Sequence, residues 1–487
     1  MVFVAYYLSM SKTNIIAREE ECRKLSMCLL ENEAQLVVVT GRRRVGKTFL
    51  INEYFDGNYK FKITGAHNES TSAQLDYFRI ELLARTGKDV GQISNWRMAF
   101  FHLQSYLSSL PKEEKKIVFF DEMPWLDTHK SGFLKAFEHF WNDFGSALHN
   151  LVFIVAGSAT SWITEKILHN KGGLYNRKTL ELAIKPFTLE ETERYLLSRG
   201  IHYSRYHIAV IYMCIGGIPY YLRMIDNAYD PLQNIDLLFF GNDAKLKGEF
   251  KSLFETLFKR DRNYIDIIEL LATKRKGYSL DEIAKGVNNQ VGGSISSMLN
   301  NLLDAGLIRK NPHYLGRKRD LYQLCDHFSL FYLSFVQGKP NQQSDYFSKN
   351  FLTPSTEAWL GFTFELLCRT HLDAIRFALG IYAIDYQAYG FDKSSENGRP
   401  GSQIDLVIER KDKVVHLCEM KFSRSEYEID ANYWRNINQK MAALSSHINK
   451  HSSMQLTFIT VCGVKDNIYR GYVNQSLTID DLFIHMK

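Results

Sequence analysis

The most constraining feature of this sequence is a glycine–lysine motif set between an apolar strand and a helical segment. Gln35 to Thr40 is a short β-branched run, and the residues after Thr48 have helical spacing. Between the two lies Gly41-x4-Gly46-Lys47-Thr48, which is the spacing of a phosphate-binding loop in the strand–loop–helix order that the motif requires. Alternating apolar strands and amphipathic segments continue to about residue 160, and this predicts a parallel sheet with helices on both faces.

Each residue type in this loop suits the binding of ATP with Mg²⁺. The glycines let backbone N–H groups wrap a phosphate, and the start of the following helix adds a favourable positive potential. Lys47 is expected to reach the terminal phosphates, and the Thr48 hydroxyl is expected to ligate Mg²⁺. The three arginines of the loop are expected to be solvated or to face a lid rather than to read bases. The residues expected to contact the nucleotide are Gly41, Arg42, Arg43, Arg44, Val45, Gly46, Lys47 and Thr48.

Two later strands end in polar residues that suit the same chemistry. The segment KKIVFFDEMPW is an apolar strand, Ile117 to Phe120, followed by Asp121 and Glu122. At the carboxyl end of a parallel strand, Asp121 can hold Mg²⁺ through water and Glu122 can polarise the attacking water. The segment NLVFIVAGSATSW is another buried strand, and Ser158 follows it. Ser158 is expected either to touch the γ-phosphate or position water, or to form only a strand-to-loop turn.

These residues resemble an AAA+-related ATPase of the archaeal-ATPase and STAND neighbourhood. The segment IAREEECRKL, with Arg18 and Glu19, is similar to the entry motif that precedes the loop, and GGIPYYL resembles the G-G-x-P motif of a helical lid. The segment GGLYNRKTLELAIKPFT resembles the one that carries an arginine finger, which falls on Arg177. The resemblance implies that Arg177 acts from a neighbouring subunit or a rearranging lid, and therefore that the protein forms a homo-oligomer. The alternative is an ordinary surface arginine.

The middle of the chain has the pattern of three short helices and a hairpin. Ser279 has the position of a helix N-cap, and Gly306 ends the third helix. A loop with Arg317, Lys318 and Arg319 joins the two expected strands. This order resembles a winged helix-turn-helix, with 294–303 as the recognition helix. That helix has serines and asparagines but no arginine, so little base-specific reading is expected from it. The cations of the loop are expected to contact DNA phosphates. The alternative is a domain that only mediates protein contacts or acts as a hinge.

The segment VVHLCEMKF raises a question about charge on a buried strand. Side chains alternate along a strand, so Glu419 and Lys421 share one face while Met420 packs on the other. The preceding segment, GSQIDLVIERKDK, is a second strand, so the two are expected to form an antiparallel hairpin. Counting back through the turn brings Asp405 opposite Cys418 or Glu419, depending on the loop: a three-residue loop at 411–413, or a bulge, would set it opposite Glu419. Facing carboxylates repel each other unless a cation joins them, although a lone Glu-x-Lys is more often a structural ion pair.

The spacing Asp-x13-Glu-x-Lys on a hairpin resembles the active site of PD-(D/E)xK nucleases. The helix WLGFTFELLCRTHL before it carries Glu365, which matches the acidic residue of the first core helix, and a long helix follows the hairpin. The resemblance implies that Asp405 and Glu419 bind Mg²⁺, that Lys421 orients or deprotonates water, and that the product is a cleaved phosphodiester. No proline precedes Asp405, which departs from the family pattern. A domain that only binds DNA or protein is the alternative.

The composition places few limits on function. The net charge of +6 is compatible with nucleic-acid binding without arguing for it. The seven cysteines are scattered and form no C-x-x-C pair, which argues against a disulfide framework or a zinc site and favours a cytoplasmic location. No apolar run approaches the roughly 20 residues of a membrane helix, so no membrane partner is expected.

The whole pattern predicts an α/β multidomain chain: a P-loop parallel-sheet ATPase with a helical lid, a winged helix-turn-helix and a C-terminal α/β restriction-endonuclease-like domain. It resembles a prokaryotic family with this order. The expected parts are an unstructured extension at 1–14, an ATPase core at 15–185, a lid at 186–255, a winged helix at 256–340 and a nuclease-like domain at 345–487. The expected function is an ATP-driven switch that gates a Mg²⁺-dependent DNA nuclease. The alternatives are a DNA-binding or partner-sensing regulator with an inert last domain, and a plain ATPase.

Overall fold

The computed structural model describes residues 14–158, 160–168, 172–174, 177–258, 262–287, 292–312, 320–339, 342–393 and 402–484. The chain divides into two compact units, one ending at Lys185 and the other beginning at Pro186. The expected extension at 1–14 lies almost wholly outside the described residues, as does the expected loop with Arg317, Lys318 and Arg319. Within the described part of the chain, no helix is both long and apolar enough to cross a bilayer.

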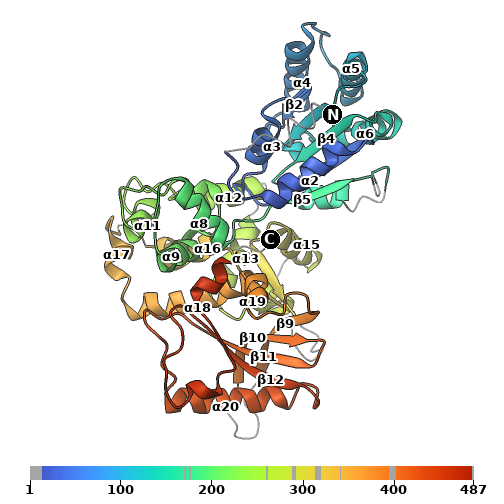
Figure 1. The fold of residues 1–487 in the computed structure, drawn as a ribbon. Helices are drawn as coiled ribbons and strands as arrows, with labels where there is room; N and C mark the ends of the chain where they lie inside the picture. The colour runs from blue at the N-terminus through green and yellow to red at the C-terminus, as the bar shows by residue number, and fades with distance from the viewer. Residues whose placement is uncertain are drawn as a thin grey trace. The chain divides into compact units, whose positions relative to one another are not determined.

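The first unit is built on a five-stranded parallel sheet with the order β2-β3-β4-β1-β5 (Figure 1). Its strands are β1 (Gln35–Thr40), β2 (Phe61–Thr64), β3 (Lys116–Asp121), β4 (Leu151–Ala156) and β5 (Leu180–Ala183). Every residue of β1, β3 and β4 is buried, which is why these strands read as continuous apolar runs rather than as alternating ones. The predicted parallel sheet is confirmed.

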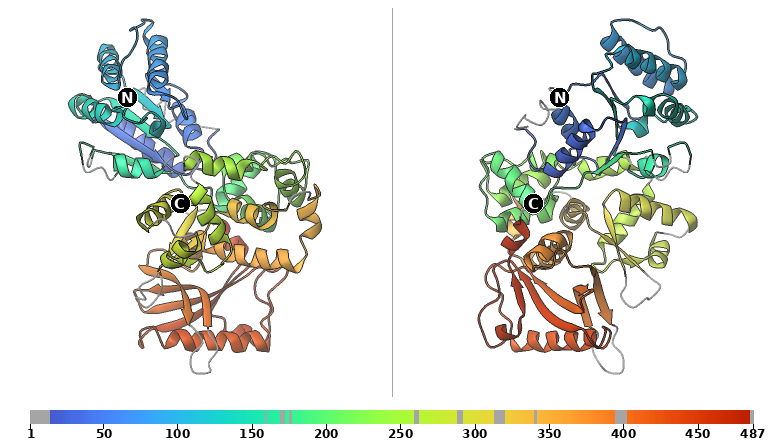
Figure 2. Two further views of the ribbon diagram at one scale, coloured as in Figure 1. Left: turned by 180° about the vertical axis from the view of Figure 1, so that it is seen from behind. Right: turned by 45° about the vertical axis from the view of Figure 1, so that its right-hand side comes forward.

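Helices cover both faces of this sheet (Figures 1 and 2). They are α2 (Glu19–Leu30), α3 (Lys47–Phe55), α4 (Thr71–Thr86), α5 (Trp96–Ser109) and α6 (Phe133–Asp143), with the shorter η1 (Met123–Trp125), η2 (Gly145–Ala147), α7 (Thr160–Ile163) and η3 (Thr164–Leu168). An aromatic core lies between one face and the α4–α6 layer, where Phe120 contacts Phe100 and Phe153. On the other face, Phe119 contacts Tyr59, which follows α3 and in turn contacts Phe55. This packing on both faces holds the β1–α3 connection at the carboxyl edge of the sheet.

The second unit begins with a group of helices. They are α8 (Leu189–Ser198), α9 (Arg205–Ile215), α10 (Pro219–Leu222), α11 (Pro231–Phe239) and α12 (Glu249–Leu257). Helix α9 is buried over most of its length, since α8, α11, α16 (His327–Phe331) and α18 (Pro354–Thr370) all pack against it. The segment continues as η4 (Tyr332–Val336) and α17 (Tyr346–Asn350). A buried histidine joins the group: the first N–H of α8 donates to His371 Nε2 at 3.0 Å.

A small antiparallel sheet follows three helices in the middle of the second unit. The helices are α13 (Arg262–Ala272), α14 (Leu280–Gly286) and α15 (Gly292–Asp304), and the strands β6 (Tyr278–Ser279), β7 (Ile308–Asn311) and β8 (Leu321–Leu324) pair in the order β6-β8-β7. Ser279 caps α14 as expected, and Glu282 completes a capping box with it. Gly306 has φ of 67° just after α15, which suits the end of a helix.

The C-terminal part is a five-stranded mixed sheet in the order β13-β12-β11-β10-β9. Strands β9 (Tyr386–Lys393), β10 (Ser402–Arg410) and β11 (Val414–Lys421) are antiparallel, whereas β12 (Ser453–Thr460) and β13 (Gln475–Leu477) run parallel to β11 and to each other. Figure 1 shows α20 (Ala431–Ser445) on one face, with α18 and α19 (Leu372–Ala378) on the other. Two short turns complete the chain, η5 (Arg470–Tyr472) and η6 (Ile479–Phe483). The predicted β10–β11 hairpin is confirmed.

Candidate functional site

The loop between β1 and α3 requires glycine at both ends. Gly41 has φ of 136°, and a Cβ there would lie 2.3 Å from the backbone oxygen of Ile184. Gly46 has φ of 94° and forms the N-cap of α3, so the chain turns sharply into the helix. Both conformations are costly for other residues. The result is a loop that curls over the N-terminus of α3, where unpaired N–H groups favour an anion.

Lys47 lies under this loop and bonds to it. Its Nζ donates to the carbonyl oxygens of Gly41 at 2.8 Å and Arg42 at 3.1 Å. Burial lowers the pKa of the Lys47 ammonium, and the Glu122 and Asp121 carboxylates oppose that effect. The ammonium therefore bonds to two neutral carbonyl oxygens, with acidic groups nearby. A polyphosphate is a stronger acceptor than a carbonyl oxygen and would compete well for this ammonium.

Thr48 and Asp121 are brought together at the edge of the sheet. The Thr48 hydroxyl donates to Asp121 Oδ2 at 2.8 Å, although 73 residues separate the two along the chain. Burial raises the pKa of the Asp121 carboxyl, and the hydrogen bond from Thr48 opposes this. An hydroxyl and a carboxylate are hard oxygen donors, so the pair fits Mg²⁺, which keeps several of its waters and takes one or two protein oxygens.

Glu122 and Ser158 form a second polar pair beside the loop. The Ser158 hydroxyl donates to Glu122 Oε2 at 2.9 Å, and the Ser158 backbone N–H donates to the same oxygen at 3.0 Å. Glu122 has φ of 45°, which is an uncommon conformation for a non-glycine residue. The carboxylate is thus held from two sides in a defined orientation. The role of Ser158 at the γ-phosphate or at the attacking water stays a prediction, and in this structure Ser158 bonds to Glu122.

The remaining loop residues are held by the rest of the first unit. Arg18 is buried, and its Nη2 donates to the Lys185 carbonyl at 2.7 Å and to the Val45 carbonyl at 3.4 Å, so this residue of the entry segment supports the loop. Arg42 is only 5% exposed, so of the two alternatives for the loop arginines it is not solvated, and contact with a lid stays a prediction.

Arg43, Arg44 and Arg177 lie nearer the surface. Arg43 and Arg44 are partly exposed, and Arg44 has φ of 73°. Arg177 is exposed, and its backbone N–H donates to the Leu174 carbonyl at 3.1 Å. Its expected role as an arginine finger stays a prediction.

The hairpin in the C-terminal sheet brings two carboxylates to the same region. The loop between β10 and β11 has three residues, and the paired positions run from Glu409↔Val415 to Leu406↔Cys418. Asp405 and Glu419 are the next residues beyond the last of these pairs, and, in addition to burial, both carboxylates raise the pKa of Glu365. Met420 is buried on the other face, which accounts for the apolar residue between two charged ones.

Glu419 is buried with its charge compensated from within the chain. It is 2% exposed, and its Oε1 accepts a bond from Lys440 Nζ at 2.6 Å. Its Oε2 accepts a short hydrogen bond from the Tyr433 hydroxyl and lies 3.7 Å from Lys421 Nζ. The Lys421 ammonium also lies 5.0 Å from the centre of the Tyr433 ring. The Glu-x-Lys pair is therefore one part of a larger ionic network.

Asp405 and Glu365 both line one cavity of about 830 Å³. Burial raises the pKa of Glu365 to about 8. The Asp405 carboxylate acts in the same direction, whereas the Lys421 and Arg275 charges lower this pKa. Asp405 Oδ1 accepts a bond from the Gln403 side chain at 2.8 Å. Two acidic groups, from α18 and β10, thus share one cavity wall.

These donors fit a divalent cation in kind, since they are carboxylates. Both oxygens of Glu419, however, already accept bonds from the chain, and an ammonium stands where the resemblance implies a metal. Across the described residues, no three His, Cys, Asp or Glu side chains are grouped so that they could ligate one ion. The role of Asp405 and Glu419 as metal ligands stays a prediction: a cation there would share Glu419 with Lys440 and Tyr433.

Sequence reasoning missed three residues of α20 that face this site. Tyr433, Asn436 and Lys440 all line the cavity and are spaced i, i+3 and i+7, which places them on one side of the helix. The pattern was visible as a polar stripe beside the buried Ile437 and Leu444. It was not interpretable without the structure, because a solvated helix face has the same appearance.

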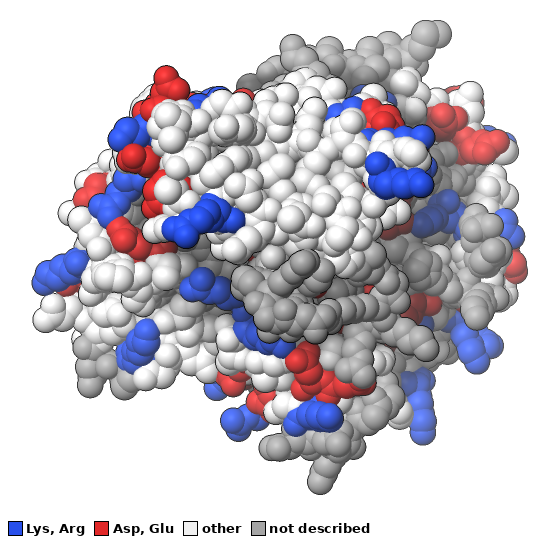
Figure 3. All heavy atoms as spheres, turned by 90° about the horizontal axis from the view of Figure 1, so that it is seen from below, with Lys and Arg blue, Asp and Glu red and all other residues white. Residues whose placement is uncertain are grey.

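Charge elsewhere is mixed on the face that Figure 3 shows. Lys and Arg side chains alternate with Asp and Glu around a broad area that has neither, and the described residues in this view form no continuous basic patch. The basic loop expected at Arg317, Lys318 and Arg319 lies outside the described residues.

Comparison with known proteins supports the assignment of the N-terminal part. Residues 15–225 match the model of a family described as an ATPase domain predominantly from Archaea. An uncharacterised protein of Methanocaldococcus jannaschii is 25% identical over 418 residues, which cover 84% of this chain and 87% of that protein. Two solved structures are similar over 66% of this chain: the Walker-type ATPase Paby2304 of Pyrococcus abyssi (TM-score 0.48, 21% identity, 96% of that chain) and the Aeropyrum pernix ORC2 protein (TM-score 0.41, 13% identity, 93% of that chain).

The family match and the loop geometry agree on the same residues. The matched region contains Gly41 to Thr48, the Thr48–Asp121 pair and Ser158, all at the carboxyl edge of a five-stranded parallel sheet. Residues 15–225 of this chain therefore form a P-loop domain that matches an ATPase domain family.

Proposed function

We propose that the protein is an ATP-driven switch that gates a metal-dependent nuclease acting on DNA. In this proposal residues 256–340 are a winged-helix adaptor and residues 345–487 are a PD-(D/E)xK-type domain. The observation that supports the nuclease half is the hairpin, in which Asp405 and Glu419 follow the last paired residues, Leu406 and Cys418, and Lys421 lies 3.7 Å from Glu419. The ATPase domain supports the switch half.

At the nucleotide site, each role follows from the bonds that a residue makes. Lys47 would exchange two carbonyl partners for the terminal phosphates, which are stronger acceptors. Thr48 and Asp121 would hold Mg²⁺, which neutralises phosphate charge when bound. Glu122 would accept a proton or hydrogen bond from the attacking water, and Ser158 would keep its carboxylate in place. We also propose that Arg177 acts across a homo-oligomer.

At the second site, the chain supplies acidic and basic groups on one face of the hairpin. Asp405, Glu419 and Glu365 are the residues that would hold a divalent cation, and such an ion supplies an activated water and charge neutralisation at a phosphodiester. Lys421 would orient that water and offset charge on the phosphate. Lys440, which bonds to Glu419, would hold that carboxylate in place.

A cleavage assay tests this proposal directly. Linear and plasmid DNA are incubated with the full chain, ATP and either Mg²⁺ or Mn²⁺, and products are followed over time. We expect Asp405→Asn to abolish cleavage and Lys47→Ala to abolish its dependence on ATP. The exposed Asp412→Asn, in the loop of the same hairpin, is the matched control and should cut like wild type. If the wild-type chain cuts neither DNA with either metal, the nuclease half is wrong.

One observation favours a second candidate, a regulator whose last domain is inert. Lys440 already satisfies Glu419 at 2.6 Å, and a buried ion pair of this kind can serve structure alone. This candidate predicts ATP-dependent DNA binding that needs no divalent metal. Calorimetric titration of Mn²⁺ into the full chain separates the two: an isotherm beyond that of the ATPase site, lost in Asp405→Asn, supports the nuclease, and its absence supports the regulator.

A further inference from the structure

The cavity beside Asp405 lies between the small three-stranded sheet and the C-terminal sheet, both within the second unit. One wall comes from β7 and the turn before β6, and the other comes from α18, β9, β10 and α20. Its acidic lining is limited to Glu365, Asp392 and Asp405. Its basic lining is twice as large: Lys274, Arg275, Lys276, Arg309, Arg369 and Lys440. This part of the chain is therefore the place where positive charge collects.

Two arginines of the cavity lining, Arg309 from one wall and Arg369 from the other, form no ion pair among the described residues, although the Asp405 and Glu365 carboxylates act on Arg369 from a greater distance. Arg309 donates through Nε and Nη2 to the amide oxygen of Gln323, at 2.9 and 2.6 Å. Arg369 donates to the side-chain oxygen of Asn311 at 2.9 Å and to the backbone oxygen of Asp405 at 3.3 Å. In the described chain, no carboxylate lies within ion-pair distance of either guanidinium. Burial and the neighbouring Arg369 lower the pKa of Arg309 to about 9. The two guanidinium groups are half-buried, carry the same charge and bond to neutral amide oxygens. This arrangement favours the binding of an anion between them.

The turn before β6 carries a third arginine, which belongs to the same wall as Arg309. Arg275 is exposed and lies 5.3 Å from the centre of the Phe362 ring, while its backbone oxygen accepts a bond from the Gln323 side chain at 2.6 Å. Gln323 thus ties the turn to Arg309. The turn is held firmly, so the position of Arg275 is defined by the fold.

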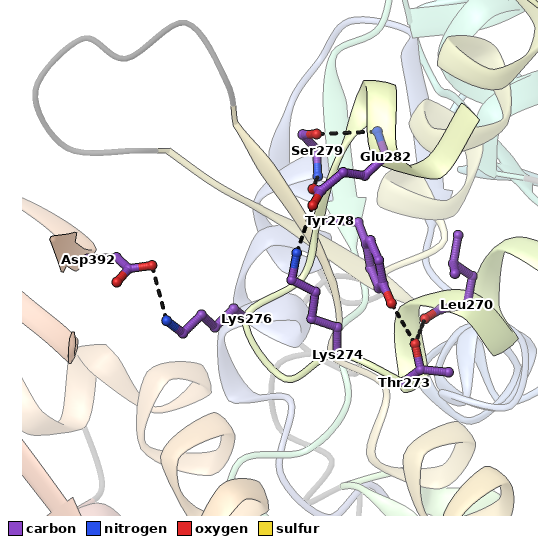
Figure 4. Close-up of polar contacts among 8 residues, drawn as sticks. All are labelled: Leu270, Thr273, Lys274, Lys276, Tyr278, Ser279, Glu282 and Asp392. Atoms are coloured by element: carbon purple, nitrogen blue, oxygen red, sulfur yellow. Dashed lines mark hydrogen bonds and ion pairs between the residues drawn. The ribbon is translucent and has the colours of Figure 1, made fainter. Parts of the chain in front are cut away.

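Figure 4 shows how the neighbours of Arg275 are held. Lys274 bonds to Glu282 at 2.8 Å, and the Thr273 and Tyr278 hydroxyls lie 2.7 Å apart. Lys276 reaches across to Asp392 of β9 at 3.1 Å. Both partners of this last pair are more than 40% exposed, and such pairs contribute little. The contact therefore does not close the cavity against a ligand.

We propose that this cavity binds the phosphodiester backbone of an unpaired nucleic-acid strand, with Arg309 and Arg369 on one phosphate and Arg275 on the next. A volume of about 830 Å³ suits a short stretch of single strand and not a duplex. Phe362 and Tyr433 also line the cavity, and a base would stack on the face of each ring that Arg275 or Lys421 does not cover. The inference deepens the proposed function, on which the strand's place beside Asp405 rests, but binding itself requires no cleavage.

Fluorescence anisotropy of a labelled single-stranded oligonucleotide tests the proposal. The full chain is titrated in EDTA, so that no cleavage occurs, and salt is varied. We expect Arg275→Ala to weaken binding about threefold to tenfold and to reduce the salt slope by roughly 0.7, the value for one lost contact with a single strand. Arg275→Glu should weaken it more than tenfold. Arg262→Glu is the matched control, because Arg262 is an exposed arginine at the far end of α13 and does not line the cavity.

Further arms make the outcomes distinct. Arg309→Met removes a charge at nearly constant volume and is interpreted only where circular dichroism matches wild type; Arg275, being exposed, does not depend on this condition. The proposal is overturned if duplex binds as tightly as single strand, if Arg262→Glu and Arg275→Glu weaken binding equally, or if inorganic phosphate alone binds in an Arg275-dependent way. Arg275-dependent strand binding without any cleavage in Mg²⁺ or Mn²⁺ supports this site and refutes the nuclease. Cleavage that is unchanged in the Arg275 variants supports the nuclease and refutes this site.

Discussion

Replacing Lys440 with methionine should loosen α20 by a predictable amount. The substitution keeps most of the side-chain volume and removes the ammonium that lies 2.6 Å from Glu419 Oε1. Glu419 stays buried at 2% exposure, so its charge loses the nearest compensation that it has. The perturbation therefore isolates one interaction between β11 and α20.

The magnitude follows from the partners that remain. Removing one member of a fully buried ion pair costs about 3–5 kcal/mol. Here the Tyr433 hydroxyl still donates to Glu419 and Lys421 remains 3.7 Å away, so part of the charge stays compensated. We therefore expect the free energy of opening to fall by about 2 kcal/mol. This corresponds to a roughly 30-fold larger equilibrium constant for the opening of α20, since about 1.4 kcal/mol is a factor of ten.

Hydrogen–deuterium exchange of peptides that cover residues 431–445 measures this quantity locally, which avoids treating a chain of two units as a single transition. The matched control is Lys465→Met, which breaks a 2.9 Å pair with Glu428 in which both side chains are more than half exposed. Its effect should stay below about 1 kcal/mol. Adding Glu419→Gln to Lys440→Met should recover about half of the loss. If Lys440→Met changes exchange no more than the control does, or if Glu419→Gln deepens the loss, the ionic network is not what holds α20.

Two further predictions concern the phosphate-binding loop and a buried histidine. Gly41→Ala should weaken ATP binding at least about tenfold by calorimetry, since a Cβ would meet the Ile184 oxygen at 2.3 Å, while Gly361→Ala, where nothing lies within 4 Å, should not; equal affinities would refute the strain argument. Burial lowers the pKa of His371 from 6.5 to about 4, so the unfolded chain binds a proton first. Stability should be full above about pH 6.5 and fall by up to about 3 kcal/mol towards pH 4. His371→Gln should reduce that fall in urea denaturation without removing it, because burial also lowers the pKa of His327 to about 3 and of His416 to about 4, and the exposed His202→Gln should leave the profile unchanged; a profile unchanged in both variants would contradict the assignment.

Local patterns in the sequence predicted much of the fold. The strand from Gln35 to Thr40, the loop from Gly41 to Thr48 and the Ser279 cap lie where expected, because each depends on a few adjacent residues and on backbone conformation. The β10–β11 hairpin was predictable for the same reason: alternation and a short polar loop determine its register.

What the sequence could not reveal are the partners of each charge. The sequence by itself determined that Thr48, Asp121, Glu419 and Lys421 exist in patterns that suit phosphate chemistry. Only the tertiary structure decided that Thr48 contacts Asp121 and that Glu419 is held by Lys440. It also decided that arginines from a distant strand and helix face one cavity. The physical reason is that the energy of a buried charge depends on the groups that packing brings within a few ångströms of it. Which groups these are does not follow from their order along the chain.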